Sequence, residues 1–125
     1  MPKTLLHTRT RSKTNSTLKK VYNKKAFNGG NIIFEICKKK NYLYLLKKYN
    51  NLNLDIFFIK DNYGNIPIFS TTFFDNYECL LYILKNCKDV EQILKYRNNY
   101  GCNLKDYLLL RNPNGECMKI IKDLN

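Results

Sequence analysis

The sequence contains a single histidine, His7, and no apolar run longer than a few residues. A Cys–His nucleophile pair would have to use that histidine, which lies in a polar segment near the start of the chain. No run approaches the roughly 20 apolar residues of a transmembrane helix, and residues 1–11 lack the apolar stretch of a secretory signal. We therefore expect an intracellular protein, not a secreted one, without a transmembrane segment.

Closely spaced metal-binding cysteines are also missing. The chain has five cysteines, and no two of them form a C-x-x-C pair. Each lies among apolar neighbours, which is typical of free thiols that pack as small hydrophobic side chains. We expect neither a metal site nor a disulfide framework. The five cysteines are Cys37, Cys79, Cys87, Cys102 and Cys117.

Acidic residues are scarce, because ten Asp and Glu stand against 22 Lys and Arg, giving a net charge of +12. Most carboxylates fall at expected turns or helix starts, where they cap backbone N–H groups. The pair Gly29-Gly30 lacks the Lys-Ser or Lys-Thr of a phosphate-binding loop. No catalytic constellation is left, so we expect a protein that is not an enzyme and has no cofactor and no small-molecule substrate.

The remaining composition fits one small folded domain. Apolar residues make up 44% of the 125 residues, which is close to the globular average. Lys, Asn, Ile and Tyr together supply 57 residues, and their codons are rich in A and T, which indicates a low-GC genome. A single Lys or Asn therefore carries little weight as a functional signal.

Residues 1–27 differ from the rest of the chain. They hold eight cations and no acid, and residues 8–17 offer no apolar side chain to bury. Such a segment cannot offset its ordering entropy, so a mobile basic arm is expected, with Val21 and Tyr22 or Phe27 docking onto the first folded element. The cations are Lys3, Arg9, Arg11, Lys13, Lys19, Lys20, Lys24 and Lys25.

From residue 28 onward the apolar residues follow helical spacing. Three glycines, Gly30, Gly64 and Gly101, recur at intervals of 34 and 37 residues among short apolar segments. This pattern predicts repeated units of turn, helix, tight loop and helix. The expected helices lie near residues 32–37, 43–49, 68–74, 77–84, 90–96 and 104–110, followed by an apolar segment at 117–121.

In the middle unit, residues 61–69 read DNYGNIPIF, and residues 78–84 read ECLLYIL. This unit resembles the ankyrin repeat, in which Asp-x-x-Gly-x-Thr-Pro-Leu-His precedes an apolar second helix. Gly64, Pro67 and the aliphatic Ile68 match the family pattern. A glycine at this place supplies a positive φ, and a proline suits the first turn of a helix.

The sequence also departs from that pattern. Ile66 and Phe69 replace the family's Thr and His, so the hydrogen bonds of those side chains must be absent. Thr71 and Thr72 stand where small alanines are usual. The third unit keeps Gly101 but has no proline after it, as closing repeats of this family often do.

The resemblance implies an all-α solenoid of about three ankyrin-like helix-turn-helix repeats, at residues 28–60, 61–97 and 98–125, behind a disordered basic arm. In this arrangement Leu81 is expected to be buried between repeats. The alternative is an irregular helical bundle whose glycines fall at these intervals by coincidence. Short, divergent repeats rich in Asn and Lys resemble those of large DNA viruses and AT-rich intracellular microbes, which would place the protein in a host cytoplasm, a nucleus or a virion.

Ankyrin-type repeats bind other proteins, so the resemblance implies a protein partner, such as a host or virion protein. The candidate contacts are side chains at the turn tips, where tyrosine provides contact area at low entropy cost. The alternative is that Tyr63 and Tyr100 pack only against each other and that the asparagines serve the turns. The candidate binding residues are Asn62, Tyr63, Asn65, Asn99, Tyr100 and Asn103.

The basic arm supports a second hypothesis of a different class. Its eight cations, interspersed with Ser and Thr, would attract phosphates by counterion release. The lysine runs at 38–40 and 47–48 would extend that patch if they share a face with the arm. In this reading the chain is a small basic protein that binds the phosphate backbone of nucleic acid, and its binding weakens steeply with salt.

Overall fold

The computed structural model describes residues 15–26 and 28–124, which are all-helical and contain no strand. No helix in these two ranges has the length and apolar character needed to cross a membrane. Residues 15–23 form a first helix. The later helices are α2 (Ile32–Cys37), a short 3₁₀ helix (Lys40–Tyr42), α3 (Leu43–Asn50), α4 (Pro67–Phe73), α5 (Tyr77–Asn86), α6 (Val90–Lys95), α7 (Leu104–Arg111) and α8 (Glu116–Leu124).

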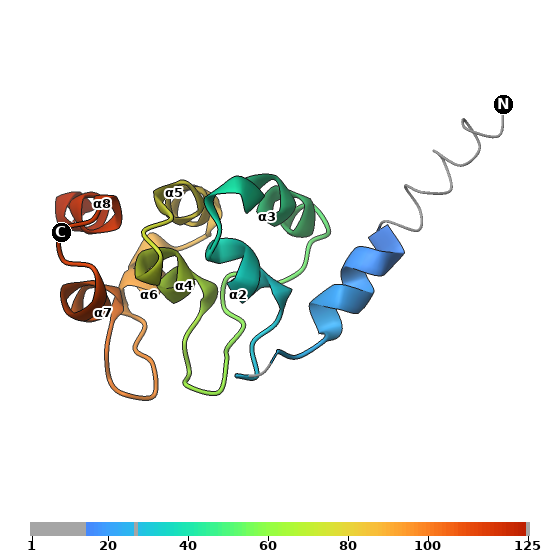
Figure 1. Ribbon diagram of the computed structural model, residues 1–125, viewed down its shortest axis with the longest axis horizontal. Coiled ribbons are helices and arrows are strands. Elements are labelled where there is room, and N and C mark those ends of the chain that lie inside the picture. Colours follow the sequence, from blue (N-terminus) through green and yellow to red (C-terminus); the bar gives the residue numbers. More distant parts are fainter. Residues whose placement is uncertain (1–14, 27, 125) are drawn as a thin grey trace, which may run out of the picture.

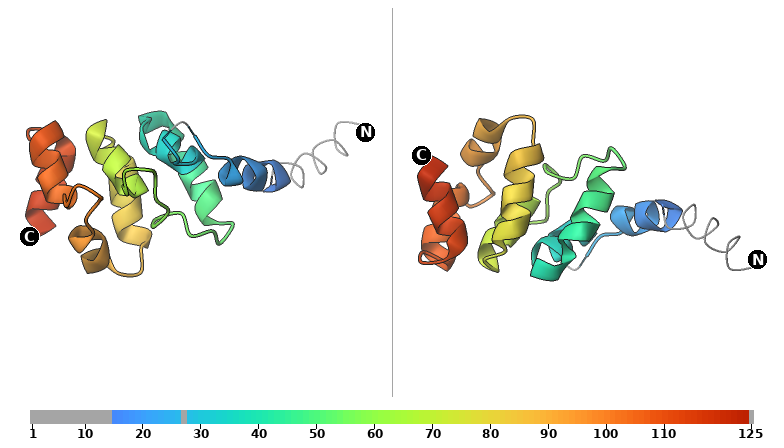
Figure 2. Two further views of the ribbon diagram at one scale, coloured as in Figure 1. Left: turned by 90° about the horizontal axis from the view of Figure 1, so that it is seen from below. Right: turned by 90° about the horizontal axis from the view of Figure 1, so that it is seen from above.

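Six of these helices form three pairs, α2 with α3, α4 with α5 and α7 with α8, and the pairs lie side by side (Figure 1). Helices α2, α4 and α7 form one row, and α3, α5 and α8 form the other (Figures 1 and 2). Within each row neighbouring helices are in contact, and each pair is in contact across the rows. Helix α6 lies between the second and third pairs in sequence and contacts α7. The described chain is therefore a two-layer stack with its ends at opposite sides.

Local signals explain where the helices start. The side chains of Asn31, Asn76 and Asn103 accept hydrogen bonds from the first-turn N–H groups of α2, α5 and α7. Asn103 also forms a capping box with Asp106. Helix α4 has no side-chain cap and begins instead with Pro67, which lacks the N–H group that would need one.

The core is a continuous layer of aliphatic side chains between the two rows. In α5 the buried face carries Leu80 and Ile83, whereas Leu81 is 46% exposed. The expectation that Leu81 is buried was wrong, because the run Cys79 to Leu84 is apolar almost throughout and does not by itself define a face. Ile66 and Phe69 are almost fully buried, so they add apolar packing where the ankyrin pattern has polar side chains.

Polar side chains also join neighbouring pairs at the end of the first row. The buried Asn76 donates its Nδ2 hydrogen to the carbonyl of Cys37 at 2.9 Å, and Asn112 donates to Thr72 at 3.4 Å. The hydroxyl of Thr72 in turn donates to the carbonyl of Phe69. The bonds of Asn76 and Asn112 therefore link carbonyls at the ends of α2 and α4 to the next pair in the stack.

Three loops with the same hydrogen bonds precede the first-row helices. Each closes over a glycine at positive φ, with φ values of 81° at Gly29, 74° at Gly64 and 78° at Gly101. The prediction that Gly64 and Gly101 have positive φ is confirmed. In the first loop the turn glycine is Gly29 rather than Gly30, whose φ is not positive. The two glycines are adjacent, and spacing alone could not decide which of them occupies the turn.

The loops are stacked on one another through their backbones. The N–H of Asn62 donates to the carbonyl of Asn28 at 2.7 Å, and the N–H of Asn99 donates to the carbonyl of Tyr63 at 3.0 Å. The side chain of Asn99 also donates to the carbonyl of Asn62. The same backbone hydrogen bond therefore recurs between successive loops, and the three loops form a ladder at one edge of the stack.

The helix at residues 15–23 corrects part of the expectation for the basic arm. Tyr22 packs against Tyr49 with ring centres 6.1 Å apart, and its hydroxyl donates to the carbonyl of Asp55 at 2.9 Å. Leu18 is also partly buried against the core. These contacts supply the apolar burial that residues 8–17 lack, so residues 15–26 are an ordered part of the fold. Residues 1–14 and Phe27 lie outside the described residues.

Three of the five cysteines are fully buried, namely Cys37, Cys79 and Cys117, while Cys87 and Cys102 are half-buried. All five thiols are free, in agreement with the sequence expectation. Burial, aided by the nearby carboxylate of Asp75, raises the pKa of the Cys117 thiol from 9.0 to about 12. This cysteine is therefore a neutral core side chain at physiological pH.

The raised pKa of Cys117 predicts a loss of stability in alkali. Above pH 9 the unfolded thiol releases a proton that the folded thiol keeps, so rising pH favours the unfolded state until the folded pKa is reached. Between about pH 9.5 and 10.5 we expect the stability advantage of wild type over Cys117→Ala to shrink by about 1 kcal/mol. Urea unfolding of both proteins under reducing conditions measures this difference, and a constant difference over that range would contradict the assignment.

Candidate functional site

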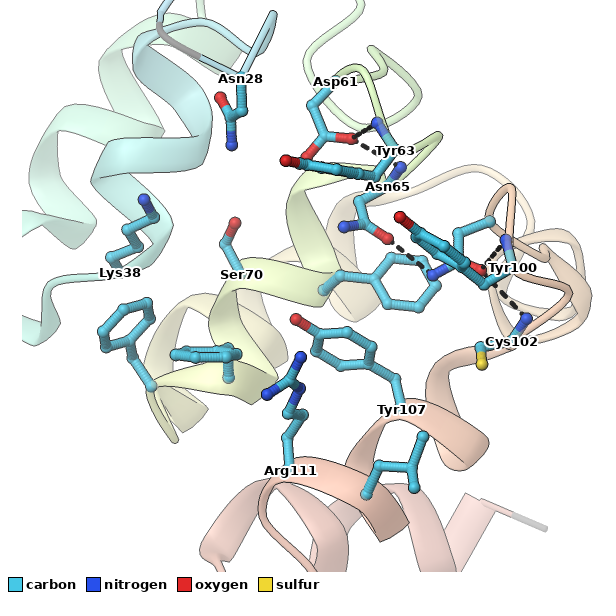
Figure 3. A pocket seen from close by; sticks show the side chains of 15 residues that line it. Asn28, Lys38, Asp61, Tyr63, Asn65, Ser70, Tyr100, Cys102, Tyr107 and Arg111 are labelled. Carbon is cyan, nitrogen blue, oxygen red and sulfur yellow. Dashed lines mark hydrogen bonds between the residues drawn. The ribbon is translucent and has the colours of Figure 1, made fainter.

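The loop ladder and the first-row helices enclose a groove of about 630 Å³ (Figure 3). One wall is formed by the second and third loops, through Asp61, Tyr63 and Tyr100. The floor is formed by α4 and α7, whose contributions include Ser70 and Tyr107. Asn28 of the first loop and Lys38 at the end of α2 also line the groove, which therefore runs across the stack and draws on all three helix pairs.

The groove gathers much of the exposed apolar surface of the chain. Nine large hydrophobic side chains of the described residues are exposed, and five of them line this groove. Their exposed fractions range from 41% to 74%. Scattered apolar residues are ordinary on a surface, but a contiguous group that lines one groove is typical of a binding site. The five are Tyr63, Phe73, Phe74, Tyr100 and Leu110.

The two candidate tyrosines are brought together at the loop tips. The rings of Tyr63 and Tyr100 are stacked, with centres 6.3 Å apart and planes at 25°. One side chain stabilises each loop. The Oδ1 atom of Asp61 accepts hydrogen bonds from the N–H groups of Tyr63 and Asn65 at 2.9 Å. In the next loop, the Oδ1 atom of Asn98 accepts from the N–H groups of Tyr100 and Cys102. The stack leaves Tyr100 72% exposed, so the outer ring has a free face for contact.

The four candidate asparagines form hydrogen bonds within the protein, between neighbouring loops or at a helix start. Asn65 accepts a hydrogen bond from Asn98 at 2.9 Å, and Asn103 caps α7. Asn99 bonds to the carbonyl of Asn62, and both of these residues are exposed at the tips. Asn65 and Asn103 therefore stabilise the fold, which is the role that the alternative hypothesis gave to the asparagines of the turns. Asn62 and Asn99 remain accessible.

Two cations and an aromatic row complete the groove, and sequence reasoning missed both. The Arg111 guanidinium lies 5.3 Å from the ring centre of Phe73 and 5.9 Å from that of Tyr107. Lys38 lies 5.9 Å from the ring centre of Phe74. The adjacent phenylalanines at the end of a predicted helix were a signal, because both cannot face one core. Their place beside Arg111 depends on packing between pairs, which spacing within one unit does not reveal.

Tyr107 is half-buried at the floor of the groove. Its ring meets that of Phe69 edge to face at 5.2 Å, and burial raises the pKa of its hydroxyl. The neighbouring Arg111 opposes this shift, both by its charge and by a hydrogen bond. Tyr107 therefore carries a neutral hydroxyl at physiological pH and offers a polar contact at the floor of the groove.

The described cations of the basic arm lie elsewhere. Lys19, Lys20, Lys24 and Lys25 are exposed, and they belong to the N-terminal helix and the segment that follows it, next to the first helix pair (Figure 1). None of these four lysines is among the residues that line the groove. The other four candidate phosphate-binding residues, Lys3, Arg9, Arg11 and Lys13, lie outside the described residues.

Across residues 15–26 and 28–124, no group of three or more His, Cys, Asp or Glu side chains is placed to hold a metal ion. The groove lining is aromatic and amide-rich, with a carboxylate occupied by backbone N–H groups. In comparisons with known proteins, no protein-family model and no curated protein matches this chain.

Proposed function

We propose that the chain is a non-catalytic protein-interaction module built as an ankyrin-type solenoid of three repeats, with the second and third repeats forming most of the binding groove. The repeated loops support this proposal, because each has a glycine at positive φ and the same backbone hydrogen bond recurs between neighbouring loops. The stacked helix pairs bury one shared core, as repeat proteins do. The boundaries are those expected from sequence, 28–60, 61–97 and 98–125, with the helix at 15–23 covering the first repeat.

The single observation that carries the binding proposal is the concentration of exposed apolar side chains in one groove. Tyrosines are enriched among residues that dominate binding energy, because they bury a large area at small entropic cost. Tyr63 and Tyr100 are already stacked on each other, so little ordering is needed when a partner docks.

The proposal is tested by affinity capture with the full chain from nuclease-treated lysate at moderate salt. We expect the variant carrying Tyr63→Ala and Tyr100→Ala to bind the captured protein at least about tenfold more weakly than wild type. Tyr44→Ala is the matched control, because Tyr44 is also exposed but lies on α3, outside the groove. It should bind as wild type does.

Two results would contradict this function. One is a captured protein that binds the double variant and wild type equally, which would place the interaction outside the groove. The other is capture that disappears with nuclease and depends on residues 1–27. That result would favour the second hypothesis, a basic protein associated with the phosphate backbone of nucleic acid.

A further inference from the structure

Arg111 is a cation in the groove without an acidic partner in the described chain. It is exposed, and it takes part in none of the four ion pairs of the described residues. Its guanidinium is held instead against the rings of Phe73 and Tyr107. One of its donors is used in the hydrogen bond to Tyr107, and the remaining donors are available to a planar carboxylate.

The contacts around Arg111 extend into a continuous row. The rings of Phe73 and Phe74 have centres 4.7 Å apart, and Lys38 lies over Phe74 at the far end. Lys38 is also paired with Glu35 at 3.1 Å, so Arg111 is the more available of the two cations. An apolar surface is thus flanked by positive charge on both sides.

The groove's own carboxylate, that of Asp61, forms no ion pair with Arg111. The Oδ1 atom of Asp61 accepts from the N–H groups of Tyr63 and Asn65, which fixes it in the loop. The chain as a whole carries +12, so its field also attracts acidic partners. Residues 1–14 hold four cations and no acid, so that segment offers no carboxylate to Arg111.

We propose that the groove selects an acidic peptide segment in which a carboxylate pairs with Arg111 and an adjacent apolar side chain packs on Phe73 and Phe74. This inference rests on the proposed function and names the chemistry of its partner. A polynucleotide fits less well, because grooves for nucleic acid carry many cations along the backbone. This groove has two cations, and one of them, Lys38, is already paired with Glu35.

The first experiment selects ligands for the full chain from a random peptide library displayed on phage. Phage that also bind the Tyr63→Ala and Tyr100→Ala double variant are removed. We expect the retained peptides to be enriched in Asp or Glu next to an aromatic or aliphatic residue. A synthetic peptide of the enriched sequence then serves as the probe, and its affinity is measured by fluorescence anisotropy.

Arg111→Gln should weaken binding of this probe by about tenfold, because a charge-assisted pair is lost. Changing the probe's acid to its amide should weaken binding to wild type equally, and the two changes together should cost little more than either alone. Lys119→Gln removes one positive charge from the exposed face of α8 and should leave the affinity unchanged. Because Arg111→Gln and Lys119→Gln each remove one positive charge, their comparison distinguishes a local ion pair with Arg111 from the effect of the chain's net charge.

The outcomes distinguish the two proposals. Retained peptides without enriched acids, or an affinity that Arg111→Gln does not change, would overturn the acidic specificity and leave the groove as a binding site. A library that yields no peptide sensitive to the tyrosine double variant would overturn both proposals. Binding of an oligodeoxythymidine that the double variant abolishes, with no peptide retained, would do the same and would assign the groove to nucleic acid.

Discussion

Replacing Leu80 with alanine should lower the free energy of unfolding by about 2–5 kcal/mol. Leu80 is fully buried in α5, and this helix contacts α3, α4 and α8. Truncation leaves a cavity that the surrounding helices can fill only in part, since they are fixed on several sides. Urea denaturation followed by far-ultraviolet circular dichroism measures the change through the midpoint and slope.

Leu81 provides a matched control one residue away. It has the same side chain on the same helix but is 46% exposed, so Leu81→Ala should cost less than about 1 kcal/mol. A larger loss for Leu81 than for Leu80 would show that the buried face of α5 is rotated by one residue. The two variants together therefore test the register of the central helix directly.

Gly64→Val should destabilise the protein by about 2–5 kcal/mol, since two costs add. The backbone has φ of 74°, a region that β-branched residues avoid. In addition, a Cβ atom at this position would lie 2.3 Å from Oδ1 and 2.9 Å from the backbone nitrogen of Asn99. The side chain of Asn99 could turn away, but its backbone nitrogen is part of the loop ladder.

Gly101→Val separates these two costs. Its φ is 78°, yet no atom lies within 4 Å of the added Cβ position. We expect this variant to lose about 1–3 kcal/mol, from backbone strain alone. Equal losses of stability for the two variants, measured by the same denaturation, would show that the stacking of the second loop on the third contributes nothing.

Local signals in the sequence were sufficient to place most helices. Helix α4, expected at 68–74, begins at Pro67 and ends at Phe73, and α6, expected at 90–96, spans Val90–Lys95. Prolines, asparagine caps and glycines act within a few residues, so their effects can be recognised in a single sequence. The positive φ of Gly64 and Gly101 was predictable for the same reason.

Features that depend on contacts between units could not be predicted in this way. The helix at residues 15–23 is stabilised by Tyr49 and Asp55, which come from a later unit. The buried face of α5 is chosen by its neighbours from an almost uniformly apolar run. The row of Phe73, Phe74 and Arg111 joins residues nearly forty positions apart. Tyr63 and Tyr100 were found because both stand at the tip of the same local loop motif.

The central claim is that the groove between the loop tips and the first-row helices binds a protein segment. Hydrogen–deuterium exchange of the full chain, with and without the captured protein, tests it most directly. The account predicts slower exchange on binding at residues 61–65 and 98–103 and along α7, with little change at residues 15–26. Slower exchange confined to residues 15–26, with the loops and α7 unchanged, would contradict it.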